Sequence, residues 1–86
     1  MAKKKAEPKK VKPKEVQALA KRIKHFRVKA GYTSQETFAY DNDYTLSYYS
    51  RIERGEDIRF MSLVRVAKAL GVDLKEFFSE GFDKLK

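Results

Sequence analysis

Apolar residues recur at helical spacing after the first fourteen positions. Between residues 15 and 30 they are Val16, Leu19, Ala20, Ile23, Phe26 and Ala30. Residues three or four apart share one face of a helix, so this spacing predicts a first amphipathic helix. Gly31 is placed to end it, because glycine readily adopts the left-handed conformation that closes many helices.

Two short helices are predicted next, between residues 33 and 55. Thr33 and Glu36 have the spacing of a capping box, in which a hydroxyl and a carboxylate each accept a hydrogen bond from a free backbone amide. Residues 42–43, Asn-Asp, favour a turn. Thr45 can cap a third helix that Gly55 ends, so a short turn is expected to join the second and third helices.

The last third of the chain predicts two further helices. Its apolar positions at helical spacing are Phe60, Leu63, Val66, Ala67 and Leu70, followed by Gly71. Asp73 and Glu76 have the spacing of another capping box, which opens a fifth helix. No alternation typical of a strand is present, so the expected fold class is all-α, with five short helices in one domain over residues 15–86.

Positive charge is concentrated ahead of the first helix. The chain has a net charge of +8, and residues 1–14 hold seven of its lysines with one glutamate. Both prolines lie here and large apolar residues are nearly absent, so the segment cannot offset its ordering entropy. We therefore expect residues 1–14 to form a disordered basic tail. A solubility tail, an arm that follows a phosphate backbone and an interaction segment are all open, and we favour the arm.

A second run of positive charge lies in the first predicted helix. Its members are Lys21, Arg22, Lys24, Arg27 and Lys29, with no acid among them. A solvated polar face and a surface that faces phosphates explain this run equally well.

Composition disfavours several classes of protein. The chain has no cysteine, which excludes disulfides and thiolate zinc sites and favours a reducing compartment. No apolar run approaches the roughly 18 residues of a membrane span, and no signal peptide is evident, so we expect a cytoplasmic protein. His25, the single histidine, lies among lysines, and no nucleophile is paired with a base. We expect neither an enzyme nor a cofactor.

Residues 35–55 carry the most informative pattern. A steep crossing of two helices requires a small residue where their backbones meet, which Ala39 supplies. It also requires a corner residue that tolerates positive φ, which Asn42 or Asp43 supplies. Capping by Thr45 would leave amides and short side chains exposed at the start of the third helix. Such a helix end can approach a phosphate or the edge of a base closely.

The same segment resembles the phage-repressor-like helix-turn-helix regulators, also called the xenobiotic-response-element family. The motifs that carry the resemblance are Ser34-Gln35-Glu36 with Phe38-Ala39, Ser50-Arg51-Ile52-Glu53-Arg54-Gly55, and Val66-Ala67-Lys68-Ala69-Leu70-Gly71-Val72. The similarity spans residues 19–78. It implies a protein that binds double-stranded DNA by placing a recognition helix, residues 45–54, in the major groove.

The resemblance also implies individual roles. The residues expected to face base edges are Thr45, Leu46, Ser47, Ser50 and Arg51. Gln35 is expected to touch a phosphate and to brace the recognition helix, and Arg54 and Arg59 are expected to touch phosphates. Of the base-facing residues, Arg51 alone can make a bidentate contact with guanine. Glu53, an acid close to phosphates, is expected instead to pair with a basic residue of the first or fourth helix.

Three residues depart from the family pattern. Asp43 stands where relatives usually have a glycine, so the turn must hold an aspartate or shift by one residue. Tyr49 replaces a small aliphatic residue, which predicts a core repacked around Tyr44 and Tyr49. Leu46 has no donor or acceptor for a base, although it can contact a thymine methyl group.

A single recognition helix with one bidentate base contact should discriminate only modestly between DNA sequences. Two half-sites would roughly double this discrimination, which favours a homodimer. The expected dimer surface is an apolar cluster near the carboxyl terminus: Phe77, Phe78, Phe82 and Leu85. The alternative is that these residues close the core under the first helix. The function expected is that of a sequence-specific, nucleoid-associated transcriptional repressor. The alternatives are an antitoxin that holds a toxin protein through its carboxyl-terminal face, and a non-specific nucleic-acid- or protein-interaction module.

Overall fold

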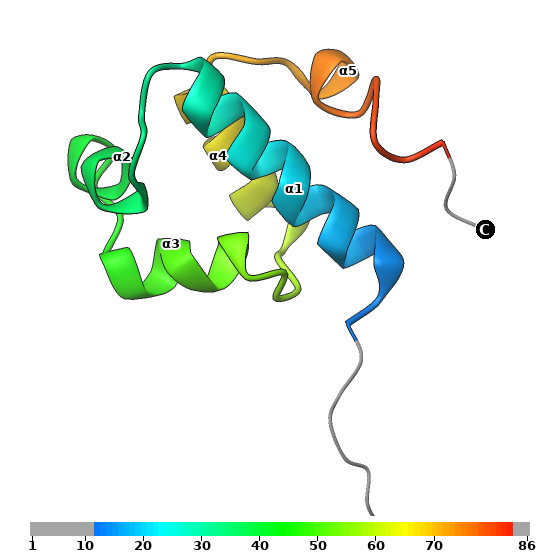
Figure 1. The fold of residues 1–86 in the computed structure, drawn as a ribbon, viewed down its shortest axis with the longest axis horizontal. Coiled ribbons are helices and arrows are strands. Elements are labelled where there is room, and N and C mark those ends of the chain that lie inside the picture. Colours follow the sequence, from blue (N-terminus) through cyan, green and yellow to red (C-terminus); the bar gives the residue numbers. More distant parts are fainter. Residues whose placement is uncertain (1–11, 84–86) are drawn as a thin grey trace, which may run out of the picture.

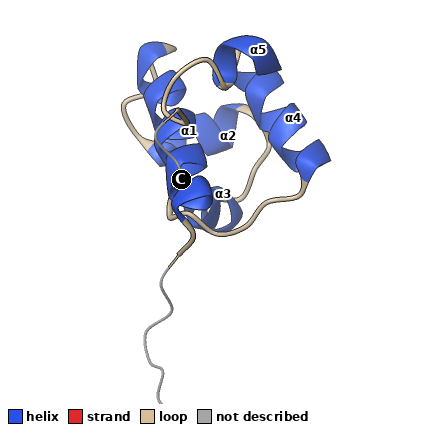
Figure 2. Cartoon of the chain, turned by 90° about the vertical axis from the view of Figure 1, so that its right-hand side faces the viewer, coloured by secondary structure: helices blue, strands red, loops and turns tan. Residues whose placement is uncertain are grey.

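Five helices make up residues 12–83, the part of the chain that the computed structural model describes (Figure 1). They are α1 (Lys14–Lys29), α2 (Gln35–Asp41), α3 (Leu46–Glu53), α4 (Phe60–Leu70) and α5 (Leu74–Phe77). No strand occurs within this range, which confirms the all-α fold class. The helices α3 and α5 lie at opposite ends of the folded part (Figures 1 and 2).

The first helix begins one residue ahead of the expected domain boundary. Pro13 is the N-cap of α1, and its carbonyl oxygen accepts a hydrogen bond from the Gln17 amide at 3.1 Å. The Gln17 side chain donates to the carbonyl oxygen of Lys12 at 2.8 Å, so the chain is tied to α1 from Lys12 onward. Residues 1–11 lie outside the described residues, and for them the disordered tail stays a prediction.

Two of the expected capping residues are confirmed. The Thr45 hydroxyl accepts a hydrogen bond from the amide of Tyr48 at 3.1 Å, which starts α3. The Asp73 carboxylate accepts from the amide of Glu76 at 2.8 Å, which starts α5. Each bond satisfies one of the backbone amides that a first helical turn leaves without a partner.

The predicted cap of α2 is wrong by one residue. Ser34 is the N-cap in place of Thr33, and its hydroxyl accepts from the amide of Thr37 at 3.1 Å. A capping oxygen reaches the amide three residues ahead of it, so a helix that starts at Gln35 is served by Ser34. Glu36 then lies in the first turn, where its negative charge suits the helix N-terminus.

The core lies where all five helices meet. Each helix contributes one of its largest fully buried side chains, which are Ile23, Phe38, Tyr49, Val66 and Phe77. The rings of Phe38 and Tyr49 lie 4.8 Å apart between centroids, and Tyr49 is also 6.0 Å from Tyr44. Each such side chain contributes about 1.5–3 kcal/mol on burial, so packing stabilises helices that are too short to be stable alone. The expected repacking around Tyr44 and Tyr49 is confirmed.

Phe77 is a core residue, and its assignment to the dimer surface is wrong. Its side chain is fully buried and its ring lies 5.9 Å from the ring of Phe26 in α1. It therefore closes the core under α1, which was the alternative interpretation. Phe78 is 41% exposed and Phe82 is half-buried, so both reach the surface. Leu85 lies outside the described residues.

A buried arginine docks α5 onto α1. Arg22 donates from Nε to the carbonyl oxygen of Phe77 at 2.8 Å and from Nη2 to that of Glu76 at 2.9 Å. Its guanidinium also lies 4.5 Å from the centre of the Phe26 ring. These bonds engage carbonyl groups at the end of α5, where a positive charge is favourable. One member of the basic run in α1 is therefore internal, facing neither solvent nor phosphates.

None of the helices within residues 12–83 combines the length and apolar character needed to cross a membrane.

The turn between α2 and α3 uses a left-handed aspartate. Asp43 has φ 62° and is the residue at the corner of the turn. The Asn42 side chain donates to the carbonyl oxygen of Phe38 at 2.9 Å, and the Tyr44 amide donates to that of Ala39 at 2.9 Å. The turn thus holds an aspartate without shifting, because aspartate tolerates this conformation better than most residues.

Replacing Asp43 by valine should lower the free energy of unfolding by about 1–2 kcal/mol, because a β-branched side chain is strained at positive φ. Replacing it by glycine should leave that free energy nearly unchanged, since glycine removes the strain but has more entropy when unfolded. Urea denaturation followed by circular dichroism measures both variants. Equal stability of the valine and glycine proteins would contradict this account of the turn.

Candidate nucleic-acid interface

The outward side of α3 is polar and basic. Ser47, Arg51 and Arg54 are all exposed and follow one another at intervals of four and three residues, so they share one face. On the opposite face Tyr49 and Ile52 are buried in the core. The helix therefore presents one continuous outward row while its inner side is packed.

Three of the expected base-facing residues gather at the amino end of α3. Thr45, Leu46 and Ser47 are all exposed, with Leu46 at 44%. The first amides of a helix carry partial positive charge and lack intrahelical partners, which suits an approaching phosphate. Short side chains at this end leave that approach open.

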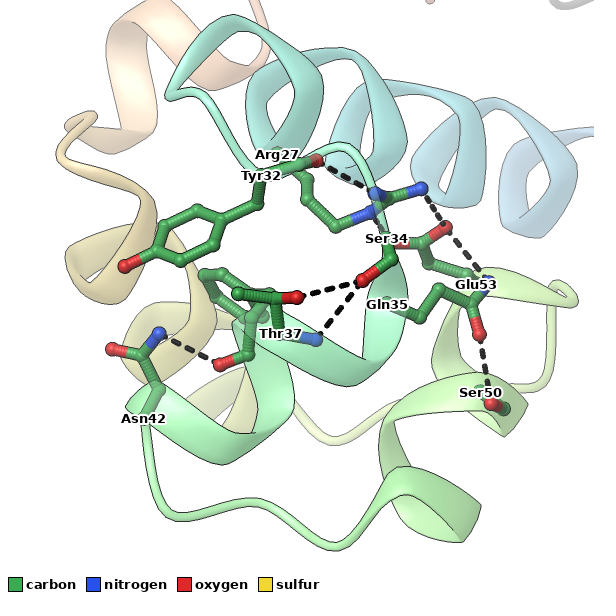
Figure 3. A network of polar contacts seen from close by, with 9 residues as sticks. Arg27, Tyr32, Ser34, Gln35, Thr37, Asn42, Ser50 and Glu53 are labelled. Atoms are coloured by element: carbon green, nitrogen blue, oxygen red, sulfur yellow. Dashed lines mark hydrogen bonds and ion pairs between the residues drawn. The ribbon is translucent and has the colours of Figure 1, made fainter.

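Ser50 lies at the edge of this face that meets α2. Its side chain is half-buried, and its hydroxyl donates to Oε1 of Gln35 at 2.7 Å (Figure 3). Its hydroxyl hydrogen is thus directed inward, while its oxygen keeps acceptor capacity. The predicted base contact of Ser50 stays a prediction.

Gln35 bridges α2 and α3. In addition to accepting from Ser50, its amide group donates from Nε2 to Oε1 of Glu53 at 3.1 Å. These two hydrogen bonds brace α3, which was one of the two roles expected for Gln35. The other expected role, a phosphate contact, stays a prediction.

A buried ion pair joins α3 to α1. Arg27 Nε lies 2.6 Å from Glu53 Oε2, and the two side chains are only 5% and 2% exposed. Arg27 also donates from Nη1 to the carbonyl oxygen of Tyr32 at 2.7 Å. The expectation that Glu53 pairs internally is confirmed, with a base from the first helix. Figure 3 shows the pair continuing through Gln35 to Ser50.

The burial of Arg27 was missed in the sequence, although a signal was present. Arg27 follows the buried Ile23 by four residues, and helical spacing places such residues on the same face. Both interpretations of the basic run in α1 treated all five of its members as surface charges. Arg22 and Arg27 are internal, which leaves Lys21, Lys24 and Lys29 exposed.

The carboxyl end of α3 is closed by a glycine turn. Gly55 has φ 86°, and its amide donates to the carbonyl oxygen of Ile52 at 3.2 Å. The amide of Glu56 donates to the carbonyl oxygen of Arg51 at 3.2 Å, which completes a Schellman motif. Lys12 donates from Nζ to the carbonyl oxygen of Arg54. A lysine at this position is favourable because the end of a helix carries partial negative charge.

The expected arginines gather near this end of α3. Arg51 and Arg59 line one hollow of about 360 Å³, together with Glu56 and Asp57. Arg54 is exposed, and its Nη2 lies 3.4 Å from Oε2 of Glu56. The structure thus places Arg51, which is expected to face base edges, close to both arginines expected to contact phosphates. It adds Glu56, which the sequence did not single out.

Comparison with known proteins assigns the family. Residues 23–77, more than half of the chain, match the helix-turn-helix family. The chain belongs to the phage-repressor-like helix-turn-helix family. It is 35% identical over 60 residues to the control protein C.MunI of Mycoplasma sp, an alignment that covers 69% of this chain and 81% of that protein. No solved structure matches the chain.

This helix-turn-helix protein is a DNA-binding transcriptional regulator, and its family and its relative point to that function and away from catalysis. Within the described residues no three histidine or acidic side chains gather to hold a metal ion. His25 is exposed on α1, where its ring lies 4.9 Å from that of Phe26.

The tyrosine that departs from the family pattern lies beside the ion pair. The Tyr49 hydroxyl is buried and has no hydrogen-bond partner within the described residues. Burial, and then the adjacent Glu53 carboxylate, raise the pKa of this hydroxyl above its ordinary value. Tyr49 therefore stays protonated and uncharged, and it acts as a core residue on the inner side of α3.

Replacing Arg27 by methionine should lower the free energy of unfolding by about 3–5 kcal/mol, because the Glu53 carboxylate would be left buried without its partner. Urea denaturation measures the loss. Replacing Glu53 by leucine in the same protein should recover most of it, since no unpaired charge then remains. A single Arg27→Met variant as stable as the parent would contradict the proposed energetic role of the pair.

Proposed function

We propose that this helix-turn-helix regulator is a repressor that binds operator DNA sequence-specifically, as a homodimer, with α3 in the major groove. The observation that carries the proposal is the outward row of α3, Ser47, Arg51 and Arg54, on a helix whose inner side is held by the Arg27–Glu53 pair. An α-helix fits the major groove, where each base pair presents a distinct pattern of donors and acceptors. The relative's designation as a control protein supports a regulatory role.

The proposed contacts divide into two classes. Base edges would meet Thr45, Leu46, Ser47, Ser50 and Arg51, of which Arg51 supplies the bidentate contact with guanine and Leu46 an apolar contact with a thymine methyl group. Phosphates would meet Gln35, Arg54 and Arg59, and these contacts would set the position of the helix without reading sequence.

Exposed apolar side chains support the proposed dimer. Phe78 is 41% exposed, and its ring lies 4.9 Å from that of Phe82. Phe60 and Met61, at the start of α4, are 61% and 55% exposed. Large apolar side chains at the surface favour burial against a partner. A dimer would place two recognition helices on half-sites one DNA turn apart, about 34–36 Å.

Replacing Arg51 by alanine should reduce discrimination at one guanine of the operator by about 5- to 150-fold, because a bidentate arginine contact contributes about 1–3 kcal/mol there. Operator sequences come first from selection of bound sites out of random duplex DNA. Fluorescence anisotropy at fixed salt then compares the selected operator with a version that lacks this guanine.

The matched control is Lys75→Ala, which removes one positive charge from α5, at the end of the molecule opposite α3. This variant should keep its discrimination. Failure of the parent protein to enrich any motif would instead favour a non-specific module, and unchanged discrimination in Arg51→Ala would refute the assignment of the recognition helix.

Deleting residues 1–11 should weaken binding to all DNA sequences about equally. The segment contains five lysines, so the slope of log affinity against log salt should become shallower by at most about 4 to 5. Lys12 is retained in this variant, which leaves its contact at the end of α3 intact. Titrations at several salt concentrations on operator and random DNA measure both effects, and a changed sequence preference would contradict the phosphate-contacting arm.

A further inference from the structure

Glu56 lies between two exposed arginines, Arg51 of α3 and Arg54, which caps the end of that helix. Its Oε1 is 3.7 Å from Nε of Arg51, and its Oε2 is 3.4 Å from Nη2 of Arg54. A carboxylate here is unexpected on a surface that is proposed to meet phosphates, because it repels them. Its position must therefore be explained by something other than phosphate binding.

The main chain brings Glu56 back to Arg51. Gly55 adopts a positive φ, and the following amide, that of Glu56, donates to the carbonyl oxygen of Arg51. Lys12 packs over this turn, with its Cδ 3.3 Å from the place where a β-carbon on Gly55 would lie. The nearness of the Glu56 main chain to Arg51 thus follows from the way the helix ends, and it places the carboxylate within reach of the guanidinium.

The contact engages the arginine at a particular nitrogen. A guanidinium has five N–H donors in a rigid plane, and a carboxylate at Nε leaves the two terminal amino groups free. Those groups are available to bind guanine O6 and N7 together. The centre of the Tyr48 ring lies 6.0 Å from Arg51 Cζ, so this ring borders the guanidinium on another side.

We propose that Glu56 is a positioning residue for DNA recognition: it orients the Arg51 guanidinium so that its terminal amino groups face the guanine edge. The inference rests on the proposed function of Arg51. The same carboxylate weakens attraction to phosphates, so it lowers affinity for all DNA while it raises discrimination. In the free protein the two side chains are 51% and 48% exposed, and the contact strengthens when DNA displaces the surrounding water.

The test compares Glu56→Gln with Asp57→Asn. Asp57 is the next residue, is exposed and lines the same hollow, yet it makes no ion pair with either arginine within the described residues. Both substitutions remove one negative charge and should raise affinity for random DNA by a similar factor. Only Glu56→Gln should also reduce discrimination at the guanine read by Arg51, by about twofold to fivefold, as expected for an exposed pair.

A second comparison uses Arg51→Ala as the background. If Glu56 acts through Arg51, adding Glu56→Gln to Arg51→Ala should cause no further loss of discrimination, which is the signature of a coupled pair. Equal discrimination by Glu56→Gln and Asp57→Asn, or a further loss in the Arg51→Ala background, would overturn the inference while the proposed function stands. Retention of discrimination by Arg51→Ala alone would overturn both. Matching urea midpoints of the variants exclude unfolding as the cause.

Discussion

The buried pair of Arg27 and Glu53 is the interaction on which the arrangement of α1, α2 and α3 depends. A carboxylate with 2% of its side chain exposed requires a partner, because an unpaired charge in that position carries a large desolvation cost. Arg27 supplies the partner from α1, and Gln35 supplies a further donor from α2. Alternative packings of α3 would break these bonds, so the pair favours one orientation of α3.

The core and the ion pair hold the inner side of α3, so the outer side of this helix has no part in the packing. The packed inner residues, Tyr49 and Ile52, supply apolar burial, while Ser47, Arg51 and Arg54 contribute little to the core. Substitutions on the outer row can therefore change the surface that α3 presents without changing how the helix is held. This separation allows one fold to present different surfaces at the same position.

Much of the fold follows from patterns that act over three or four residues. Apolar spacing and capping residues such as Thr45 and Asp73 identified the helices because these signals are local. The cap of α2 was misassigned because Thr33 and Ser34 are adjacent hydroxyl residues, and only the path of the chain after Gly31 decides between them. Local signals thus identify an element more reliably than its first residue.

The remaining errors concern tertiary packing. Phe77 was assigned to the surface because a helix of four residues has no clear inner face in the sequence, and its burial depends on the docking of α5 by Arg22. Charged residues such as Arg27 were counted as solvated because burial depends on a partner far along the chain. In the candidate site, the outward row was predictable from spacing and family resemblance. The position of Glu56 was not, since it depends on how the chain turns after α3.

The contact of Lys12 with the end of α3 has a practical consequence for handling this protein. Because the described chain starts beside the carbonyl group of Arg54, any fused domain, affinity tag or fluorophore joined ahead of Lys12 is tethered next to the proposed DNA-facing surface. Such an addition would crowd that surface.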